Sequence, residues 1–288
     1  MYRFIYFLFF ISSALTLACC QREPVVNPKP DKALFDSIPF SVVIQPIISE
    51  ASGIADSKKN QGYLWVQEDG GNPTQLYLLK HDGAVQKKIY ISGVSNRDWE
   101  DMVLSGADIY LGEIGDNNGV YQEYAFYKFP EPLVTTDTIN TVETIRFRYA
   151  DGAHDAEAFL VDPADKAIYI ITKRDSHSKV YKLVPPFAAS SVHIAEAVGQ
   201  LSYSGVVGAA ISSDRKEIIV KTYFGLTYYK VENSESIVTA LSKTPITIPY
   251  IAEPQGEAVC FSNANHGYFT LSEKGGAAEV KLYFYRRN

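Results

Sequence analysis

Five segments of the chain share one pattern, and this repeat constrains the fold more than any other feature. In the clearest copy, residues 154–162 read as a strand opened by a carboxylate, and residues 167–173 read as a second apolar strand that ends in a charged residue. The copies are spaced 48, 57, 52 and 48 residues apart when they are aligned on Ser52, Glu100, Glu157, Ala209 and Glu257. A period of this length in β-rich sequence is typical of propeller blades or a similar array.

Composition agrees with a β-rich globular domain. The chain has 288 residues, of which 46% are hydrophobic, and this is enough to bury a core without disulfides or a structural metal. Its 20 Tyr and 15 Phe suit pleated, half-buried strands. The formal net charge is −6 and Lys and Arg form no run, so the sequence argues against a nucleic-acid partner.

Two further strands are expected after each opening pair of strands. The predicted segments are 75–80 and 85–91, 124–129 and 144–149, 179–183 and 194–201, and 226–231 and 245–250. The last copy has only residues 279–285 left, so we expect residues 40–45 to supply its missing outer strand. The sequence therefore predicts an all-β fold: a β-propeller over residues 40–288 with five four-stranded blades, closed by the N-terminal strand. A six-bladed propeller, which needs one more repeat, is the alternative.

The N-terminus carries an export signal. Residues 4–17 form an apolar run that is too short to span a bilayer comfortably and suits the core of a signal peptide over residues 1–18. The run ends at Thr16-Leu17-Ala18-Cys19-Cys20, which resembles the bacterial lipoprotein signal. We expect the lipid on Cys19, with Cys20 as the alternative, and a monomer anchored to a bacterial membrane in the cell envelope, on its periplasmic or surface side. A simple secretory signal with two incidental cysteines is the competing interpretation.

A linker is predicted between the signal peptide and the propeller. Residues 19–39 contain four prolines among polar residues and show no usable periodicity, so they are expected to form an extended tether. Removing residues 21–38 is accordingly expected to leave stability nearly unchanged.

Charged residues are expected to gather at one mouth of the central channel. In an antiparallel hairpin the start of one strand lies beside the end of the next. The predicted neighbours are Ser52 with Glu68, Glu100 with Glu113, Glu157 with Lys173, Ala209 with Lys221, and Glu257 with Glu273. So many carboxylates in a narrow space require a cation or another compensating ligand.

These residues supply the candidate site. Metal ligands are expected at Glu68, Glu113, Asp116, Glu257 and Glu273, catalytic carboxylates at Glu100 and Glu157, and ligand-binding side chains at Arg97, Lys173, Lys221 and His154. Hard oxygen donors with few His or Cys favour calcium or magnesium over zinc, and calcium is the expected cofactor. The loops at 69–72 and 115–118 are also good turn sequences in their own right.

Four short motifs carry a resemblance to known proteins. Ser-Gly-Ile with Leu-Trp, Asp-Trp-Glu-Asp at 98–101, Gly-Asp-Asn at 115–117 and His-Asp-Ala-Glu-Ala at 154–158 resemble a family of uncharacterised bacterial exported proteins and lipoproteins with a propeller fold, over residues 48–285. More distantly, residues 255–259 and 271–273 look like the strand pairs of calcium-dependent β-propeller phytases and gluconolactonase-type propellers. The resemblance implies an acidic channel mouth that holds cations. Phytases add basic residues for phosphate, and here only Lys173, Lys221, Arg97 and Arg174 are available for that part.

Two functions follow as hypotheses. The first is an exported, lipid-anchored propeller that binds a divalent cation at its acidic axial mouth and there engages or hydrolyses a small anionic ligand, a phosphoester or a lactone. The second is a non-catalytic envelope module that docks a protein or a glycan. The sequence leaves open whether the protein is an enzyme.

Overall fold

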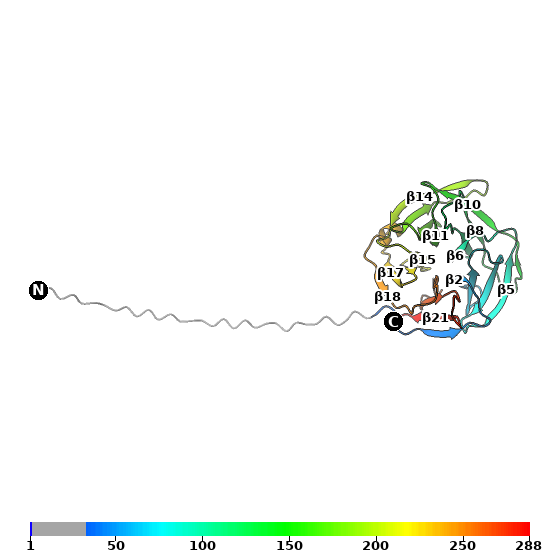
Figure 1. Cartoon of the computed structure of the whole chain (residues 1–288), viewed down its shortest axis with the longest axis horizontal. Helices are drawn as coiled ribbons and strands as arrows, with labels where there is room; N and C mark the ends of the chain where they lie inside the picture. The colour runs from blue at the N-terminus through cyan, green and yellow to red at the C-terminus, as the bar shows by residue number, and fades with distance from the viewer. Residues whose placement is uncertain (2–32) are drawn as a thin grey trace. The chain divides into compact units, whose positions relative to one another are not determined.

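The computed structural model describes Met1 and residues 33–288 (Figure 1). The predicted signal peptide, Cys19 and Cys20, and the tether up to residue 32 lie outside the described residues, apart from Met1. The described part consists of strands β1 to β21 and one short helix, α1 (Ile237–Leu241), so the predicted all-β class is confirmed. None of the described helices is long and apolar enough to cross a membrane.

The strands form antiparallel groups that follow chain order, except that β1 joins the last group. The first is β2 (Ala51–Asp56), β3 (Tyr63–Glu68), β4 (Gln75–Lys80) and β5 (Val85–Ile91). The next two are β6 (Trp99–Ser105), β7 (Asp108–Glu113), β8 (Tyr124–Pro130) and β10 (Glu143–Tyr149), and then β11 (Ala156–Val161), β12 (Ile168–Thr172), β13 (Lys179–Leu183) and β14 (Val192–Gln200). The last two are β15 (Val206–Ile211), β16 (Glu217–Thr222), β17 (Gly225–Lys230) and β18 (Ile246–Ile248), and then β19 (Ala258–Phe261), β20 (Gly267–Leu271), β21 (Lys281–Arg286) and β1 (Phe40–Val43).

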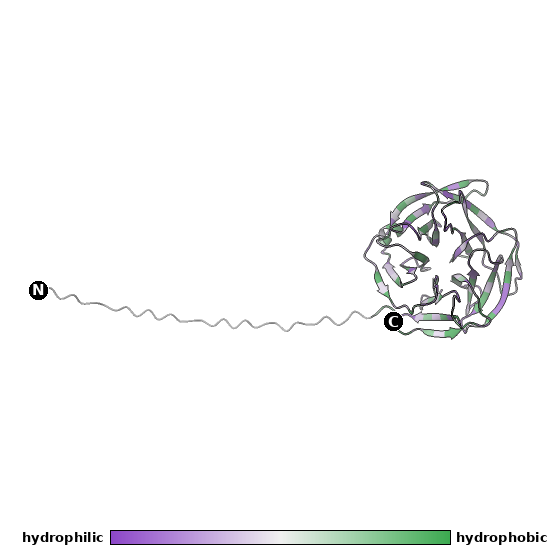
Figure 2. Ribbon diagram, in the orientation of Figure 1, coloured by the Kyte–Doolittle hydropathy of each residue, from purple (hydrophilic) through white to green (hydrophobic). Residues whose placement is uncertain are grey.

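The first strand of each group lies innermost. β2 packs against β6, β6 against β11, β11 against β15 and β15 against β19, and β19 packs back against β2 (Figure 1). The inner strands β2 and β11 are buried along their whole length, whereas the outer strands β5 and β10 largely alternate between buried and more exposed residues. Figure 2 colours the strands by hydropathy. One hydrophobic cluster fills each space between neighbouring groups. Trp65 and Leu78, for example, pack against Leu111 and Phe129.

Two contacts between outer strands are not part of the predicted repeat. β10 pairs with β14 in parallel, which joins the second and third groups into one eight-stranded sheet. β9 (Thr138–Ile139) adds in parallel to β5. Neither pairing can be predicted from the sequence repeat. The repeat describes the first two strands of each group, whereas these pairings involve outer strands and a connecting segment.

The N-terminal strand occupies the predicted place. β1 pairs antiparallel with β21, with Phe40 opposite Phe284, so the expected pairing of the two chain ends is confirmed. The packed region starts earlier than expected, however. Phe35 is fully buried, lies 4.8 Å from the ring of Tyr268, and forms a β-bridge with Arg287. The predicted boundary at residue 39 is therefore too late, because Phe35 and the hydrogen bonds of residues 33–36 already fix this segment to the domain.

Candidate functional site

Backbone irregularities lie at the start of the inner strands. The pairing register shifts between Ala51 and Gly53, between Trp99 and Met102, between Ala156 and Ala158, and between Val206 and Gly208. A bulge leaves an extra residue unpaired and re-aims its side chain. The extra residues are Ser52, Glu100 with Asp101, Glu157 and Val207. The predicted equivalence of Ala209 is thus wrong, because the bulge of the fourth inner strand lies two residues earlier, at Val207.

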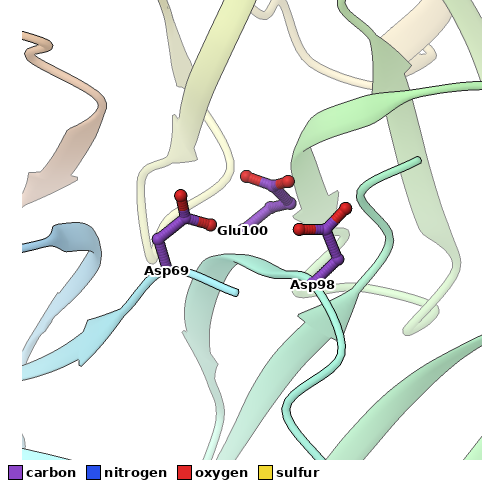
Figure 3. Close-up of side chains that lie close together, drawn as sticks. All are labelled: Asp69, Asp98 and Glu100. Carbon is purple, nitrogen blue, oxygen red and sulfur yellow. The ribbon is translucent and has the colours of Figure 1, made fainter. Parts of the chain in front are cut away.

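Five carboxylates meet where these bulges lie. One oxygen each from Asp69, Asp98 and Glu100 lie within 4.8 Å of one another, and the side chains point toward a common centre (Figure 3). One oxygen each from Glu100, Asp155 and Glu157 satisfy the same limit. We call Asp69, Asp98, Glu100, Asp155 and Glu157 the carboxylate cluster. Asp69 directly follows β3, while Asp98 and Asp155 lie just before β6 and β11.

Two buried carboxylate oxygens near the start of inner strands have no hydrogen-bond donor. Within the described part of the chain, Glu157 Oε2 and Glu257 Oε2 are buried without a hydrogen-bond partner. Glu157 is 4% exposed, and its other oxygen, Oε1, accepts a hydrogen bond from Lys173 Nζ. Glu257 Oε1 accepts from the Tyr223 hydroxyl at 2.7 Å, and that hydroxyl accepts from Lys173 Nζ at 3.2 Å. Lys173 and Tyr223 therefore link the carboxylate cluster to Glu257.

Burial and mutual repulsion oppose ionisation of these groups. Burial, and next the charge of Glu257, raises the pKa of Glu157 to about 8. Burial, and next Glu157, raises the pKa of Glu100 well above its usual value. The pKa of Asp98 is raised to about 6 and that of Glu273 to about 7, by burial first and by neighbouring carboxylates second. A cation at this position would favour the ionised forms.

Two glycines allow the carboxylates to approach so closely. A Cβ atom on Gly115 would lie 2.6 Å from the carboxylate of Asp98 and would collide with Glu100 Oε1. A Cβ atom on Gly70 would lie 2.9 Å from Cα of Asp98. Both glycines come from loops that the sequence marks as turns, and here they are needed for space around the carboxylates.

Three of the predicted metal ligands are held by other hydrogen bonds. Glu68 accepts from Tyr77 at 2.6 Å and from the Ser49 amide at 3.2 Å. Glu113 accepts from the Arg97 amide and from the Tyr127 hydroxyl, both at 2.9 Å. Neither carboxylate belongs to the carboxylate cluster.

Asp116, the third, closes its own loop. It accepts from the amides of Val120 and Tyr121 at 2.9 and 2.8 Å and from the Tyr124 hydroxyl at 2.8 Å. Burial acts to raise its pKa, but these hydrogen bonds outweigh burial and hold the pKa below its usual value. The loop that positions Gly115 is therefore fixed from within.

The remaining predicted ligands, Glu257 and Glu273, lie beside the carboxylate cluster. Charge on Glu257 raises the pKa of Glu157, and charges on Glu257 and Asp69 raise that of Glu273. Both glutamates therefore add to the negative field around the carboxylate cluster without belonging to either group of close oxygens.

Of the four predicted ligand-binding side chains, Lys173 reaches the carboxylate cluster. Lys221 is completely buried elsewhere, 2.9 Å from Glu253 and 4.0 Å from the ring centre of Tyr250. A second basic side chain does reach the carboxylate cluster: Arg174 donates from Nε to Asp155 Oδ2 at 2.6 Å.

Arg97 and His154 are engaged outside the carboxylate cluster. Arg97 stacks 3.8 Å from the ring centre of Tyr121, with its Nε 3.5 Å from Glu113. His154 lies 3.1 Å from Asp175 and 2.7 Å from the Tyr181 hydroxyl.

Asp69, Asp98 and Asp155 are not among the metal ligands that the sequence predicts. A signal exists for two of them. Asp98 and Glu100 are two residues apart, as are Asp155 and Glu157, and the same Asp-x-Glu spacing opens two successive inner strands. Residues i and i+2 of an extended chain point to one side, so the repeated spacing places two carboxylates together.

Known structures support the fold. No protein-family model and no curated protein matches the chain. A solved structure of the PQQ-bound form of aldose sugar dehydrogenase from Streptomyces coelicolor is 9% identical, covers 88% of this chain and 100% of that chain, and has a TM-score of 0.51. An auxiliary nutrient binding protein from Bacteroides thetaiotaomicron is 8% identical, covers 88% of this chain and 73% of that chain, and has a TM-score of 0.49. The chain is thus similar in fold to propeller-like proteins.

Proposed function

We propose that the protein is an exported, lipid-anchored propeller with five four-stranded blades that binds a divalent cation at the carboxylate cluster and engages a small anionic ligand there. The blade count is supported by the inner strands β2, β6, β11, β15 and β19, each of which opens one antiparallel group. The eight-stranded sheet counts as two blades because its halves meet only through the parallel pair β10 and β14.

The buried, unpartnered Glu157 Oε2 beside Glu100 and Asp155 carries the cation proposal. A buried acceptor without a donor loses about 1–3 kcal/mol of hydration free energy, and more when it is charged. Calcium binds oxygen at about 2.3–2.6 Å, so two oxygens on one ion lie at most about 5 Å apart. The 4.8 Å limit that the carboxylate oxygens satisfy is compatible with this geometry.

We expect the anionic ligand to bind next to two basic side chains. Lys173 and Arg174 border the carboxylate cluster, and the Arg174 side chain is 53% exposed. Three carboxylates fill only part of a calcium shell of six to eight oxygens, which leaves positions for water or a ligand oxygen. A bound cation would polarise a phosphoryl or carbonyl oxygen or acidify a water molecule. Glu157 and Glu100 are the candidate bases, and Lys173 is suited to stabilise negative charge.

Calcium is expected to raise the melting temperature of the wild type, and EDTA to lower it. An ion that binds only the folded state adds about 2.7 kcal/mol at one hundred times Kd. Glu157→Gln should shrink the calcium response and raise stability in EDTA, because it removes a repelling charge. Differential scanning calorimetry with and without calcium measures both effects.

Glu217→Gln is the matched control. Glu217 is also buried, but it is paired with Arg287 at 2.7 Å and hydrogen-bonded to Tyr228 at 2.8 Å. This variant should lose stability while it keeps the full calcium response. If calcium shifts neither the wild type nor this control, the cation site does not exist.

A second experiment separates an enzyme from a docking module. The purified protein is assayed for phosphatase, esterase and lactonase activity with calcium and with EDTA. Calcium-dependent turnover supports a hydrolase. Binding of an envelope protein or glycan without any turnover favours the docking module.

The lipid anchor is tested by fractionation. Replacing both Cys19 and Cys20 by Ser is expected to release the protein from membranes or to block processing of the precursor. Membrane partitioning that is unchanged in this double variant would contradict the lipoprotein assignment.

A further inference from the structure

The carboxylate cluster contains two groups of oxygens rather than one. Asp69 and Asp98 form one group with Glu100, and Asp155 and Glu157 form the other group with Glu100. Among the described residues, no single group unites all five carboxylates within the 4.8 Å limit. Because one cation reaches only oxygens that lie this close together, one cation can occupy only one of the two groups.

Glu100 belongs to both groups, and its carboxylate is not engaged by other described residues. It is 3% exposed, and the hydrogen bonds that it accepts within the described part of the chain, from Ser52 and Gln67, end on its backbone carbonyl rather than on its carboxylate. A carboxylate has two oxygens and about four lone-pair sites, so it can bind two cations at once. Two-metal sites bridged in this way place the ions about 3.5–4 Å apart.

The other ligands are already oriented. Asp155 Oδ1 accepts from the Asp116 amide at 2.8 Å, and Oδ2 accepts from Arg174, so its carboxylate plane is fixed. Glu157 is held by Lys173 through one oxygen, while the other has no donor. In the first group, Asp69 and Asp98 flank Glu100 (Figure 3). Gly70 and Gly115 leave the space that these carboxylates occupy, because a Cβ atom on Gly70 would collide with Asp98 and one on Gly115 with Asp98 and Glu100.

The local charge also calls for more than one divalent ion. Seven carboxylates act on one another here: the five of the carboxylate cluster, Glu257 and Glu273. Two basic side chains, Lys173 and Arg174, contact them. When all seven carboxylates are ionised, these nine groups carry an excess of five negative charges, which falls to three with one divalent cation and to one with two. Buried charge of one sign is unfavourable, so the second ion adds substantially to the balance.

We propose that the carboxylate cluster binds two divalent cations side by side, with Glu100 ligating both, Asp69 and Asp98 completing the first position, and Asp155 and Glu157 completing the second. This inference rests on the proposed cation-binding function and specifies its stoichiometry.

The stoichiometry of calcium binding tests it. Equilibrium dialysis of the purified protein against calcium, with the metal content measured by mass spectrometry, should give two ions per wild-type chain. The double variant Asp69→Asn/Asp98→Asn and the single variant Glu157→Gln should each retain one ion. Glu100→Gln should weaken both ions by at least about tenfold, because it removes the shared ligand. Glu217→Gln should retain two.

Each other result has a defined meaning. One ion per wild-type chain overturns the two-ion site and leaves the proposed cation-binding function standing, whereas no ion overturns both. A Glu100→Gln protein that loses only one ion overturns the bridging role. The wild-type measurement decides the central question even if a variant fails to fold.

Discussion

Replacing Phe35 by Ala is expected to lower the free energy of unfolding by about 3–5 kcal/mol, the usual loss for a buried Phe truncated to Ala. Phe35 is fully buried against Tyr228 and Tyr268 and joins the cluster between the fourth and last strand groups. The guanidinium of Arg287 also lies over its ring, at 4.8 Å from the centroid. Urea denaturation measures the difference.

Phe40→Ala provides the matched control, with the same change five residues further along. Phe40 lies in β1 but is 64% exposed, so its truncation should change stability by less than about 0.5 kcal/mol. Equal losses of unfolding free energy in the two variants would show that strand β1, rather than Phe35 before it, closes the domain. A deletion that ends at residue 38 also removes Phe35, so it is now expected to destabilise the domain.

The second large effect concerns pH. In EDTA, stability is expected to fall as the pH rises from about 4.5 to about 8. Glu157 has an ordinary pKa of 4.5 and a folded-state pKa of about 8, so between these values the folded state holds a proton that the unfolded chain has released. The penalty is absent below the lower value and complete above the upper one. Its size is on the order of several kcal/mol, and Asp98 and Glu273 add to it in the same direction.

Calcium should reverse this dependence, because it binds the ionised carboxylates and binds better as the pH rises. Melting temperatures at several pH values, in EDTA and in calcium, test both signs. Glu157→Gln should flatten the EDTA curve, while Glu217→Gln should keep its slope. A wild-type stability in EDTA that rises from pH 5 to pH 8 would contradict the repulsion on which the site depends.

The repeat made the architecture predictable, because two-stranded apolar units at near-constant spacing cannot bury their faces alone and must stack. Phe35 could not be predicted in the same way. It is a lone aromatic residue in a proline-rich segment, and its burial depends on Tyr268 and Arg287, more than 200 residues away. The helix α1 was missed because its five residues are too few to show a period.

Two site residues could be predicted because a charged side chain is unusual inside an apolar strand. Glu100 and Glu157 interrupt apolar strands, and turn chemistry gives no reason for them there. Asp69, Asp98 and Asp155 were harder to assign, since Asp is common in turns. Glu68 and Glu113 are engaged by Tyr77 and Tyr127 from the third strand of their groups. Strand register decides which side chain of the third strand contacts the carboxylate on the second strand. The sequence does not fix that register.

The parallel pairing of β10 with β14 bears on how the protein behaves at high concentration. An outermost strand offers unpaired backbone groups to which another molecule can add, and this is a route to aggregation. β10 and β14, of seven and nine residues, satisfy each other along Arg146–Tyr149 and Val192–Ala195, and β9 partly covers β5. The outer strands left without such cover in the described region, β18 and β1, have only three and four residues. The pairings of β10 with β14 and of β5 with β9, which are not part of the repeat, thus protect the longest outer strands from edge-to-edge association.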